Sequence, residues 1–86
     1  MDWAKYAWLK RGSRRIDVLT RLQNYKSPVS INDIKKDSKI SIPQTSVIIK
    51  ELLENKLINC LNPKDKIGKL YIINEEGIKL LGEIEK

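Results

Sequence analysis

The sequence predicts a mainly α-helical fold of the α+β class that carries one small β-hairpin. Apolar residues recur at helical spacing over 16–22 and again over 45–53, which predicts two amphipathic helices. Two short apolar runs, 57–61 and 70–73, flank a loop of turn residues, which predicts a hairpin. The length of 86 residues fits one domain, since domains usually have about 50 to 250 residues.

Residues 1–11 are expected to form an N-terminal arm that packs on a domain formed by 12–86. The aromatic spacing in this arm suits either a short helix or an alternating strand. Trp3, Tyr6 and Trp8 are three of the five aromatic residues of the chain, and their simplest role is to cover the core. Because aromatic residues are enriched at interfaces, these three are also the candidate contacts of a homodimer.

The first helix of the main domain is expected to begin at Ser13, whose hydroxyl can cap the N-terminus. Ile16, Leu19 and Leu22 form an apolar stripe at helical spacing, which predicts the face that packs on the core. The helix should end near Tyr25, because a proline follows three residues later.

Two further helices are expected, separated by a short turn. Ser30 followed by Asp33 is a capping signal that opens a short helix over 31–37. A turn follows at 38–41. The next helix runs over 43–55 and has a proline in its first turn, where a missing N–H costs no helical hydrogen bond. Its inward-facing residues are expected to be Thr45, Ile49, Leu52 and Leu53.

The hairpin is expected to join strands 57–61 and 70–73 through the loop 62–69. Val29 is expected to form a very short additional strand. Asn74 can cap a last helix that has two glutamates in its first turn, where the helix dipole favours negative charge. The residues of this helix expected to face the core are Ile78, Leu81 and Ile84.

The charge balance predicts an anionic partner. The chain has 17 basic and 11 acidic residues, a net charge of +6 and a pI near 9.6. A basic excess of this kind attracts nucleic acid or an anionic membrane surface. No apolar run approaches the roughly 18–20 residues of a membrane-spanning helix, and the N-terminus lacks the layout of a signal peptide. We therefore expect a cytoplasmic protein without a membrane segment.

The residue types that most enzyme and metal sites need are missing from the sequence. With no histidine and the single cysteine Cys60, the chain can form no Ser-His or Cys-His pair, no internal disulfide and no Cys/His metal site. A Gly-rich phosphate loop ending in Gly-Lys-Ser/Thr is also absent. We therefore expect no catalytic activity, no cofactor and no metal ion.

Several short motifs occur in a fixed order along the chain. Arg15 and the pair Val18-Leu19 lie in the first helix, and Ile34 and the Ile40-Ser41 turn follow. The longest stretch comprises Ile49-x-x-Leu52, then Leu57-Ile58-x-Cys60-Leu61-Asn62-Pro63, then Gly68-Lys69-Leu70-Tyr71-x-Ile73-Asn74-Glu75-x-Gly77. With these motifs in this order and spacing, the chain resembles the archaeal winged helix-turn-helix transcriptional regulators.

The resemblance covers about 12–81 and implies a winged helix-turn-helix fold, double-stranded DNA as the partner and a tendency to form dimers. Helix 43–55 would be the recognition helix in the major groove, and the loop 62–69 would be the wing on the phosphate backbone or in the minor groove. The residues expected to contact bases are Gln44, Thr45, Ser46 and Val47. The residues expected to contact phosphates are Arg14, Arg15, Lys39, Lys50, Lys64, Lys66 and Lys69.

The densest basic run of the chain is Lys10, Arg11, Arg14 and Arg15. Arg14 and Arg15 begin a helix, where the helix dipole disfavours cations. We therefore expect a compensating partner, which is either phosphate or a carboxylate that pairs with Arg15. The carboxylates considered for this pair are Asp2, Asp17 and Glu85.

The sequence departs from the family pattern at two places. Val47 stands where the relatives often have a basic residue, and Ile48 follows it. These two outward or half-outward apolar residues could contact thymine methyl groups or a protein partner. Lys39 stands where the relatives usually have glycine, so the turn is expected to differ in shape. The alternatives to a DNA-binding regulator are a protein-interaction winged helix and nonspecific binding of chromatin or RNA.

Overall fold

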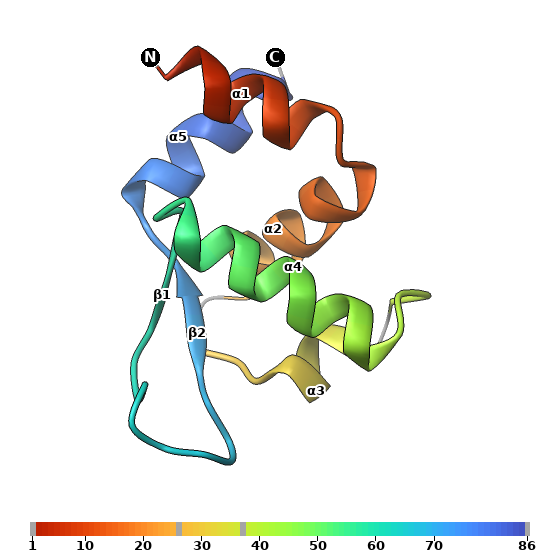
Figure 1. Cartoon of the computed structure of the whole chain (residues 1–86), viewed down its shortest axis with the longest axis vertical. Coiled ribbons are helices and arrows are strands. Elements are labelled where there is room, and N and C mark those ends of the chain that lie inside the picture. The colour runs from red at the N-terminus through yellow and green to blue at the C-terminus, as the bar shows by residue number, and fades with distance from the viewer. Residues whose placement is uncertain (1, 26, 37, 86) are drawn as a thin grey trace.

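Helix α4 (Ile42–Glu54) crosses the middle of the fold and contacts α2 (Ser13–Asn24), α3 (Ile31–Lys35) and β1 (Ile58–Cys60). The computed structural model describes residues 2–25, 27–36 and 38–85 (Figure 1). The other elements are α1 (Trp3–Lys10), β2 (Tyr71–Ile73) and α5 (Glu75–Ile84). The domain is therefore mainly helical α+β with a two-stranded antiparallel hairpin, as the sequence predicts. Within the described ranges, no helix is long and apolar enough to span a bilayer.

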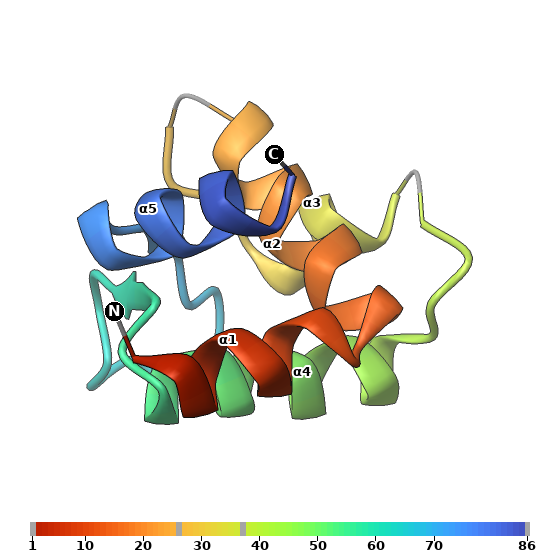
Figure 2. The same cartoon turned by 90° about the horizontal axis from the view of Figure 1, so that it is seen from above.

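The N-terminal segment is helical rather than extended. Asp2 caps α1 by accepting a backbone N–H hydrogen bond of 3.1 Å in the first turn. The helix packs against α2 and α5 (Figure 2), and its Leu9 is fully buried in the core. Tyr6 and Trp8 are half-buried against the same core, whereas Trp3 is 70 % exposed. Two of the three aromatic residues of the segment therefore cover the core, and α1 contributes a core residue of its own.

One hydrophobic core lies between the helices and the hairpin. The apolar stripe of α2 that the sequence predicts is buried at Leu19 and Leu22 and half-buried at Ile16. Ile49 and Leu52 of α4 face this stripe and are at most 2 % exposed. Because fully burying a leucine or isoleucine side chain contributes about 1.5–3 kcal/mol, this packing fixes which side of α4 faces the interior.

Side-chain caps also define where three further helices begin. Ser30 and Asp33 form the predicted capping box at α3, and the hydrogen bonds from the Ser30 backbone N–H and hydroxyl lower the pKa of the Asp33 carboxyl group. A second capping box, which the sequence analysis does not identify, joins Ser41 and Gln44 at the start of α4. Asn74 caps α5 as predicted, because its Oδ1 accepts a backbone N–H bond of 2.9 Å.

Two expectations about helix ends need correction. Ser13 does not cap α2, because the N-cap residue is Gly12 and no side-chain hydrogen bond closes this end. Helix α3 ends at Lys35, so it is shorter than the predicted range 31–37. Residue 37 itself lies outside the described residues.

The hairpin is shorter than predicted. The strands pair only over the register pairs Ile58↔Ile73, Asn59↔Ile72 and Cys60↔Tyr71. Just beyond them, the Leu61 N–H donates a 2.9 Å hydrogen bond to the Leu70 carbonyl oxygen. The strand predicted at Val29 is a single bridge to Tyr71, made of two hydrogen bonds of 3.0 and 2.8 Å. This bridge ties the segment before α3 to β2 and so brings the start of α3 next to the hairpin.

Helix α5 buries two of the three residues expected to face the core. Ile78 is 44 % exposed, so the expectation that it faces the core is wrong. Leu81 is fully buried and Ile84 is half-buried against the core, both as predicted, and Gly77 and Leu80 are the further buried residues of this helix. Successive helical residues point about 100° apart, so a face formed by residues 77, 80, 81 and 84 turns Ile78 toward solvent.

We predict that Gly77→Ala destabilises the domain, whereas Gly82→Ala in the same helix stabilises it. A Cβ added at Gly77 would collide with the Leu57 carbonyl oxygen and lie 2.7 Å from Ile73 Cγ1, and overpacking of this kind costs about 1–3 kcal/mol. A Cβ added at Gly82 meets nothing within 4 Å, and alanine is favoured over glycine in a helix by about 0.5–1 kcal/mol. Urea denaturation of the two variants measures both effects. A neutral Gly77→Ala would contradict the close packing of α5 on the hairpin.

Candidate nucleic-acid interface

The N-terminal half of α4 presents a stripe of exposed side chains. These residues are Ile42, Pro43, Gln44, Ser46, Val47 and Lys50. Two residues of this helix considered as contacts to a partner are buried, and for Thr45 this confirms the separate expectation that it faces inward. Thr45, an expected base contact, is fully buried, and its hydroxyl donates a 2.9 Å hydrogen bond to the Ser41 carbonyl oxygen, so it cannot reach a ligand. Ile48, expected to be outward or half-outward, is 7 % exposed and belongs to the core.

A groove on one flank of α4 carries three arginines, and we call it the arginine groove. Its main lining residues are Arg11, Arg14 and Arg15 from the α1–α2 junction and Gln44, Val47 and Glu51 from α4. Arg11 and Arg14 are exposed, and neither is in an ion pair with any described residue. Arg11 belongs to the basic run of the sequence but is not among the expected phosphate contacts. Its position at the end of α1 brings it beside α4.

Arg15 joins three helices at the back of the arginine groove. Its Nη1 donates a 2.8 Å hydrogen bond to the Trp8 carbonyl oxygen, and its guanidinium lies 4.5 Å from the centre of the Trp8 ring. Its Nη2 lies 3.5 Å from Glu51 Oε2. The partner of Arg15 is therefore Glu51, and none of the three carboxylates considered from the sequence. Arg15 holds α1 and the start of α2 against α4.

The three carboxylates considered for Arg15 have other partners. Asp17 pairs with Arg21 one turn away, at 3.2 Å. Glu85 accepts a 3.3 Å hydrogen bond from the Thr20 hydroxyl, and Asp2 caps α1. These contacts are local or lie at the other end of α2, away from the arginine groove. The acidic residue that lines the arginine groove is therefore Glu51.

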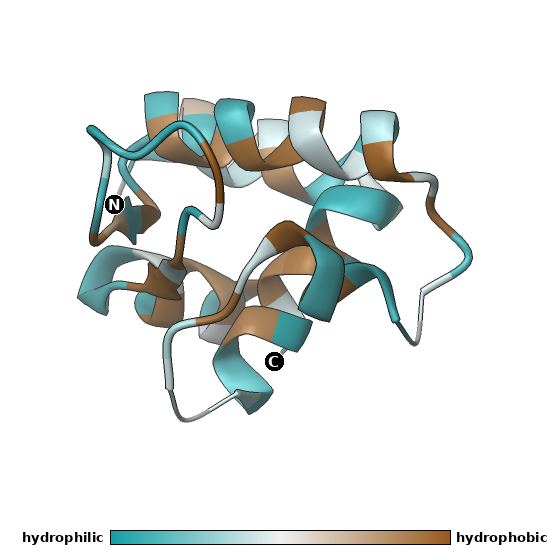
Figure 3. Cartoon of the chain, turned by 90° about the horizontal axis from the view of Figure 1, so that it is seen from below, coloured by the Kyte–Doolittle hydropathy of each residue, from teal (hydrophilic) through white to brown (hydrophobic). Residues whose placement is uncertain are grey.

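A second groove, which we call the lysine groove, lies on the other flank of α4. Its main lining residues are Lys66, Gly68 and Lys69 from the hairpin loop, Ile42 and Ser46 from α4, and Asn32 from α3. We use the name hairpin loop for residues 62–69. Seen from below, the hairpin loop and α4 lie on the same side of the molecule (Figure 3). Lys66 is exposed and Lys69 is half-buried, and neither is in an ion pair with any described residue.

Helical geometry places the two grooves on opposite flanks of one exposed stripe. At about 100° per residue, Ile42 and Ser46 point to one side of α4, and Gln44 and Glu51 point about 160° away from them. Residues between these two directions face outward. Val47 is one of them, and its side chain is accordingly 59 % exposed. The structure therefore brings together Gln44, Ser46, Val47, Arg14, Arg15, Lys66 and Lys69 of the expected contacts.

The other expected phosphate contacts are placed around this stripe. Lys39 lines a shallow groove with Arg14, beside the turn before α4. This turn needs no left-handed residue, because the described residues with positive φ are Lys56 and Gly68. The Ser38 hydroxyl accepts a 3.1 Å hydrogen bond from the Ile40 N–H, so a serine side chain shapes the turn. The remaining two, Lys50 on α4 and Lys64 in the hairpin loop, are exposed.

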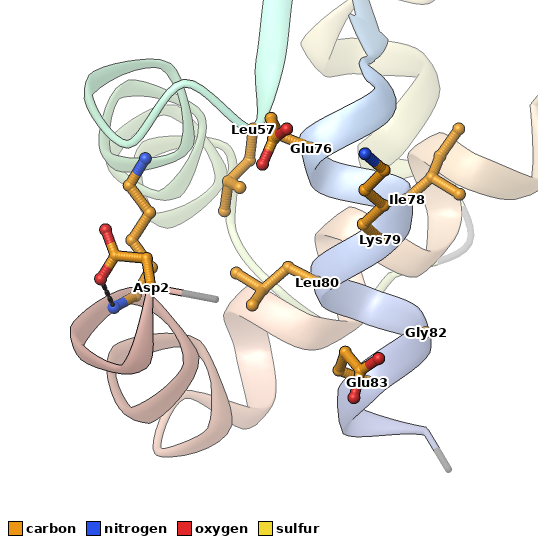
Figure 4. A pocket seen from close by; sticks show the side chains of 9 residues that line it. Asp2, Leu57, Glu76, Ile78, Lys79, Leu80, Gly82 and Glu83 are labelled. Atoms are coloured by element: carbon orange, nitrogen blue, oxygen red, sulfur yellow. Dashed lines mark hydrogen bonds between the residues drawn. The ribbon is translucent and has the colours of Figure 1, made fainter.

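A groove between α1 and α5 differs from the other two in its charge. Figure 4 shows Leu57 and Leu80 at this groove, with acidic and basic side chains around it. The charged residues that line it are Asp2, Lys5, Glu76, Lys79 and Glu83. Three carboxylates against two ammonium groups give no net attraction for a polyanion.

Trp3, a candidate dimer contact, packs edge-to-face on Tyr6 of the same helix α1, with 5.6 Å between the ring centres.

Residues suited to metal binding do not gather in the described part of the chain. No group of three or more Cys, Asp or Glu side chains there could hold a metal ion together. Cys60 is half-buried in the hairpin, with its Sγ 3.9 Å from Asn62 Oδ1.

The geometry of the exposed stripe and its two cationic grooves suits binding of an extended anionic surface. Comparisons of the chain with protein-family models, with curated proteins and with solved structures each found no match.

We predict that Arg15→Ala destabilises the domain by about 2 kcal/mol, because it removes a partly buried cation–π contact and a charged hydrogen bond together. Glu51→Gln should cost less than about 1 kcal/mol, since the ion pair is long and both side chains are partly exposed. Arg15→Lys keeps the charge but loses the planar stacking on Trp8, so it should restore little stability. Urea denaturation measures all three variants. Full recovery in Arg15→Lys would show that charge alone matters at this position.

Proposed function

We propose that this domain is a winged helix-turn-helix that binds double-stranded DNA as a transcriptional regulator. In this proposal α4 lies in the major groove and the hairpin loop acts as the wing on the phosphate backbone. The observation that carries the proposal is that the arginine groove and the lysine groove flank the same exposed stripe of α4. A duplex offers the complementary pattern, because two phosphate backbones border a groove lined by base edges.

The dimensions of the domain support this proposal. The 13 residues of α4 span about 20 Å, and a helix with its side chains is about 10–12 Å wide, against about 12 Å for the major groove. The domain measures 34 Å along its longest axis, which is close to one helical turn of DNA. A single domain is therefore large enough to reach the phosphates on both sides of one major groove.

Three side chains of α4 are proposed to contact base edges. The Ser46 hydroxyl can donate to or accept from several bases, and the Val47 methyl groups can contact the methyl group of thymine. Gln44 also takes part in the capping box, because its Oε1 accepts a 3.3 Å hydrogen bond from the Ser41 N–H. This bond holds the Gln44 side chain at the leading end of α4, where recognition helices contact bases.

Binding of an apolar protein partner through α4 is less well supported. That alternative needs a continuous apolar surface, and the buried position of Ile48 removes half of the proposed pair. Val47 remains 59 % exposed, but residues of the two cationic grooves surround it. Nonspecific binding of chromatin or RNA needs the same cations. An experiment that compares binding of duplex DNA with binding of RNA is therefore needed to separate it from specific DNA binding.

We predict that the domain binds duplex DNA with an affinity that falls steeply with salt, and that Lys66→Gln/Lys69→Gln flattens this dependence. The slope of log affinity against log salt is about −0.9 per phosphate contact, so the double variant should lose about two units of slope. Fluorescence anisotropy of labelled duplexes at four salt concentrations gives the slopes. Single-stranded RNA and double-stranded RNA of the same sequence serve as competitors.

The matched control for this experiment is Lys5→Gln/Lys79→Gln, which removes the same charge from the groove between α1 and α5. This control should keep the wild-type slope, because those lysines lie away from the proposed interface. Equal losses in the two double variants would mean that only net charge matters, and that α4 and its flanks are not the interface. Binding that does not respond to salt would also rule out the proposed mode.

We predict that Gln44→Glu weakens DNA binding at least tenfold while leaving the stability of the domain unchanged within about 0.5 kcal/mol. Glutamate can replace glutamine in a capping box, so the start of α4 is preserved. The new negative charge beside the arginine groove repels phosphate, and the lost amide donor removes a contact to a base. Gln44→Ala is a poorer test, since loss of the cap costs about 0.5–2 kcal/mol. Unchanged binding by a stable Gln44→Glu would exclude this position from the interface.

A further inference from the structure

The groove between α1 and α5 is a concave surface that the proposed DNA interface does not use. Its volume is about 480 Å³, within the range of about 300–1,000 Å³ that is typical of small-molecule sites. Gly82 of α5 lines it, and a Cβ added there would meet nothing within 4 Å. The groove is therefore open beside this glycine and has room for a small organic molecule.

The floor of this groove is apolar. Leu57, just before β1, and Leu80 of α5 point into the space between the two helices (Figure 4). Ile78 also lines the groove, and its side chain is 44 % exposed. Covering apolar surface contributes about 25 cal/mol per Å² removed from water. The groove therefore favours a ligand with an apolar body.

Charged side chains of both signs border the apolar floor. The carboxylates are those of Asp2, Glu76 and Glu83, and the ammonium groups are those of Lys5 and Lys79. Three negative and two positive charges leave the lining with a net charge of −1, in a chain whose net charge is +6. A ligand with one positive charge would make the lining neutral, whereas an anion would add a second uncompensated negative charge. Charge complementarity therefore selects a monocation.

We infer that the groove between α1 and α5 binds a small organic monocation, a primary amine carried on an aromatic or alkyl body. The apolar body covers Leu57 and Leu80, and the carboxylates at the rim hold the ammonium group. Glu76 is the carboxylate to test, because it is exposed and in no ion pair with a described residue. Asp2 already caps α1, and Glu83 takes part in another interaction. This site goes beyond the proposed function and does not depend on DNA binding.

The test compares three probes of nearly the same shape with the full-length protein. Phenethylamine is protonated at neutral pH, because primary amines have a pKa near 10. Phenethyl alcohol is its neutral analogue, and phenylacetate is its anionic analogue. Both tryptophans of the chain, Trp3 and Trp8, lie in α1, so their fluorescence reports on binding beside this helix. Phenethylamine should bind saturably, about fivefold more tightly than the alcohol, and phenylacetate should bind most weakly.

Two variants of adjacent glutamates isolate the charge at the rim. Glu76→Gln should lose most of the preference for the amine and keep the wild-type affinity for the alcohol. Glu75→Gln is the matched control, because it removes the same charge from the same first turn of α5 and is not among the residues that line the groove. It should keep the wild-type preference.

A third variant blocks the space itself. Gly82→Leu should abolish binding of the amine and of the alcohol, because its side chain extends into the open part of the groove. Leucine is a good helix former, so α5 should remain intact, and circular dichroism checks the fold.

Four outcomes would overturn this inference. The first is absence of saturable binding by phenethylamine and by hexylamine, which has an alkyl body. The second is equal affinity for the amine and the alcohol. The third is an equal loss in Glu75→Gln and Glu76→Gln, because net charge alone would then decide binding. The fourth is unchanged amine binding by folded Gly82→Leu. All four are measured without nucleic acid, so they leave the proposed DNA binding to its own tests.

Discussion

The fold and its candidate interface both depend on the burial of one side of α4. Thr45, Ile49 and Leu52 are at most 2 % exposed and form the inner stripe of this helix. Because helical residues lie about 100° apart, burying these three turns Val47 and Lys50 toward solvent. The exposed stripe is therefore a consequence of the core, and changes that repack the core would also rotate the residues available to a partner. Hydrophobic burial thus sets the geometry in which the charged groups act.

Electrostatics distinguish two arginines that are neighbours in sequence. Both lie in the first turn of α2, where the helix dipole disfavours a cation by roughly 0.3–1 kcal/mol. For Arg15 the Trp8 contacts and Glu51 offset this cost within the domain. Arg14 has no ion pair with a described residue and lines the arginine groove, so the fold itself does not compensate its position. A phosphate group near the start of α2 would provide that compensation, which agrees with the proposed binding mode.

Local patterns in the sequence predict the order of the elements and two of the helix caps, whereas contacts between distant segments decide much of the rest. The Ser30 and Asn74 caps follow from side chains within three residues of their targets. The face of α5 does not, because Ile78 and Leu80 each suit a helical stripe with Leu81, and only packing against distant segments, chiefly α1 and α2, selects Leu80. The pairing of Arg15 likewise spans 36 residues, which no local pattern encodes. Among the expected contacts, Thr45 fails for a local reason, because the helical stripe that predicts it to face inward excludes it from contact with a base.

The net charge of +6 has opposite consequences for the unbound domain and for a complex with DNA. Repulsion among the cations destabilises the compact state, and added salt screens it, since the Debye length is about 8 Å at physiological ionic strength. The same screening and counterion competition weaken binding to phosphates. Salt should therefore stabilise the fold over the range in which it dissociates DNA. Loss of binding at high salt then reports on the interface and not on unfolding. At low salt, repulsion among its own cations destabilises the unbound domain most, and a bound duplex should stabilise the domain most under the same condition.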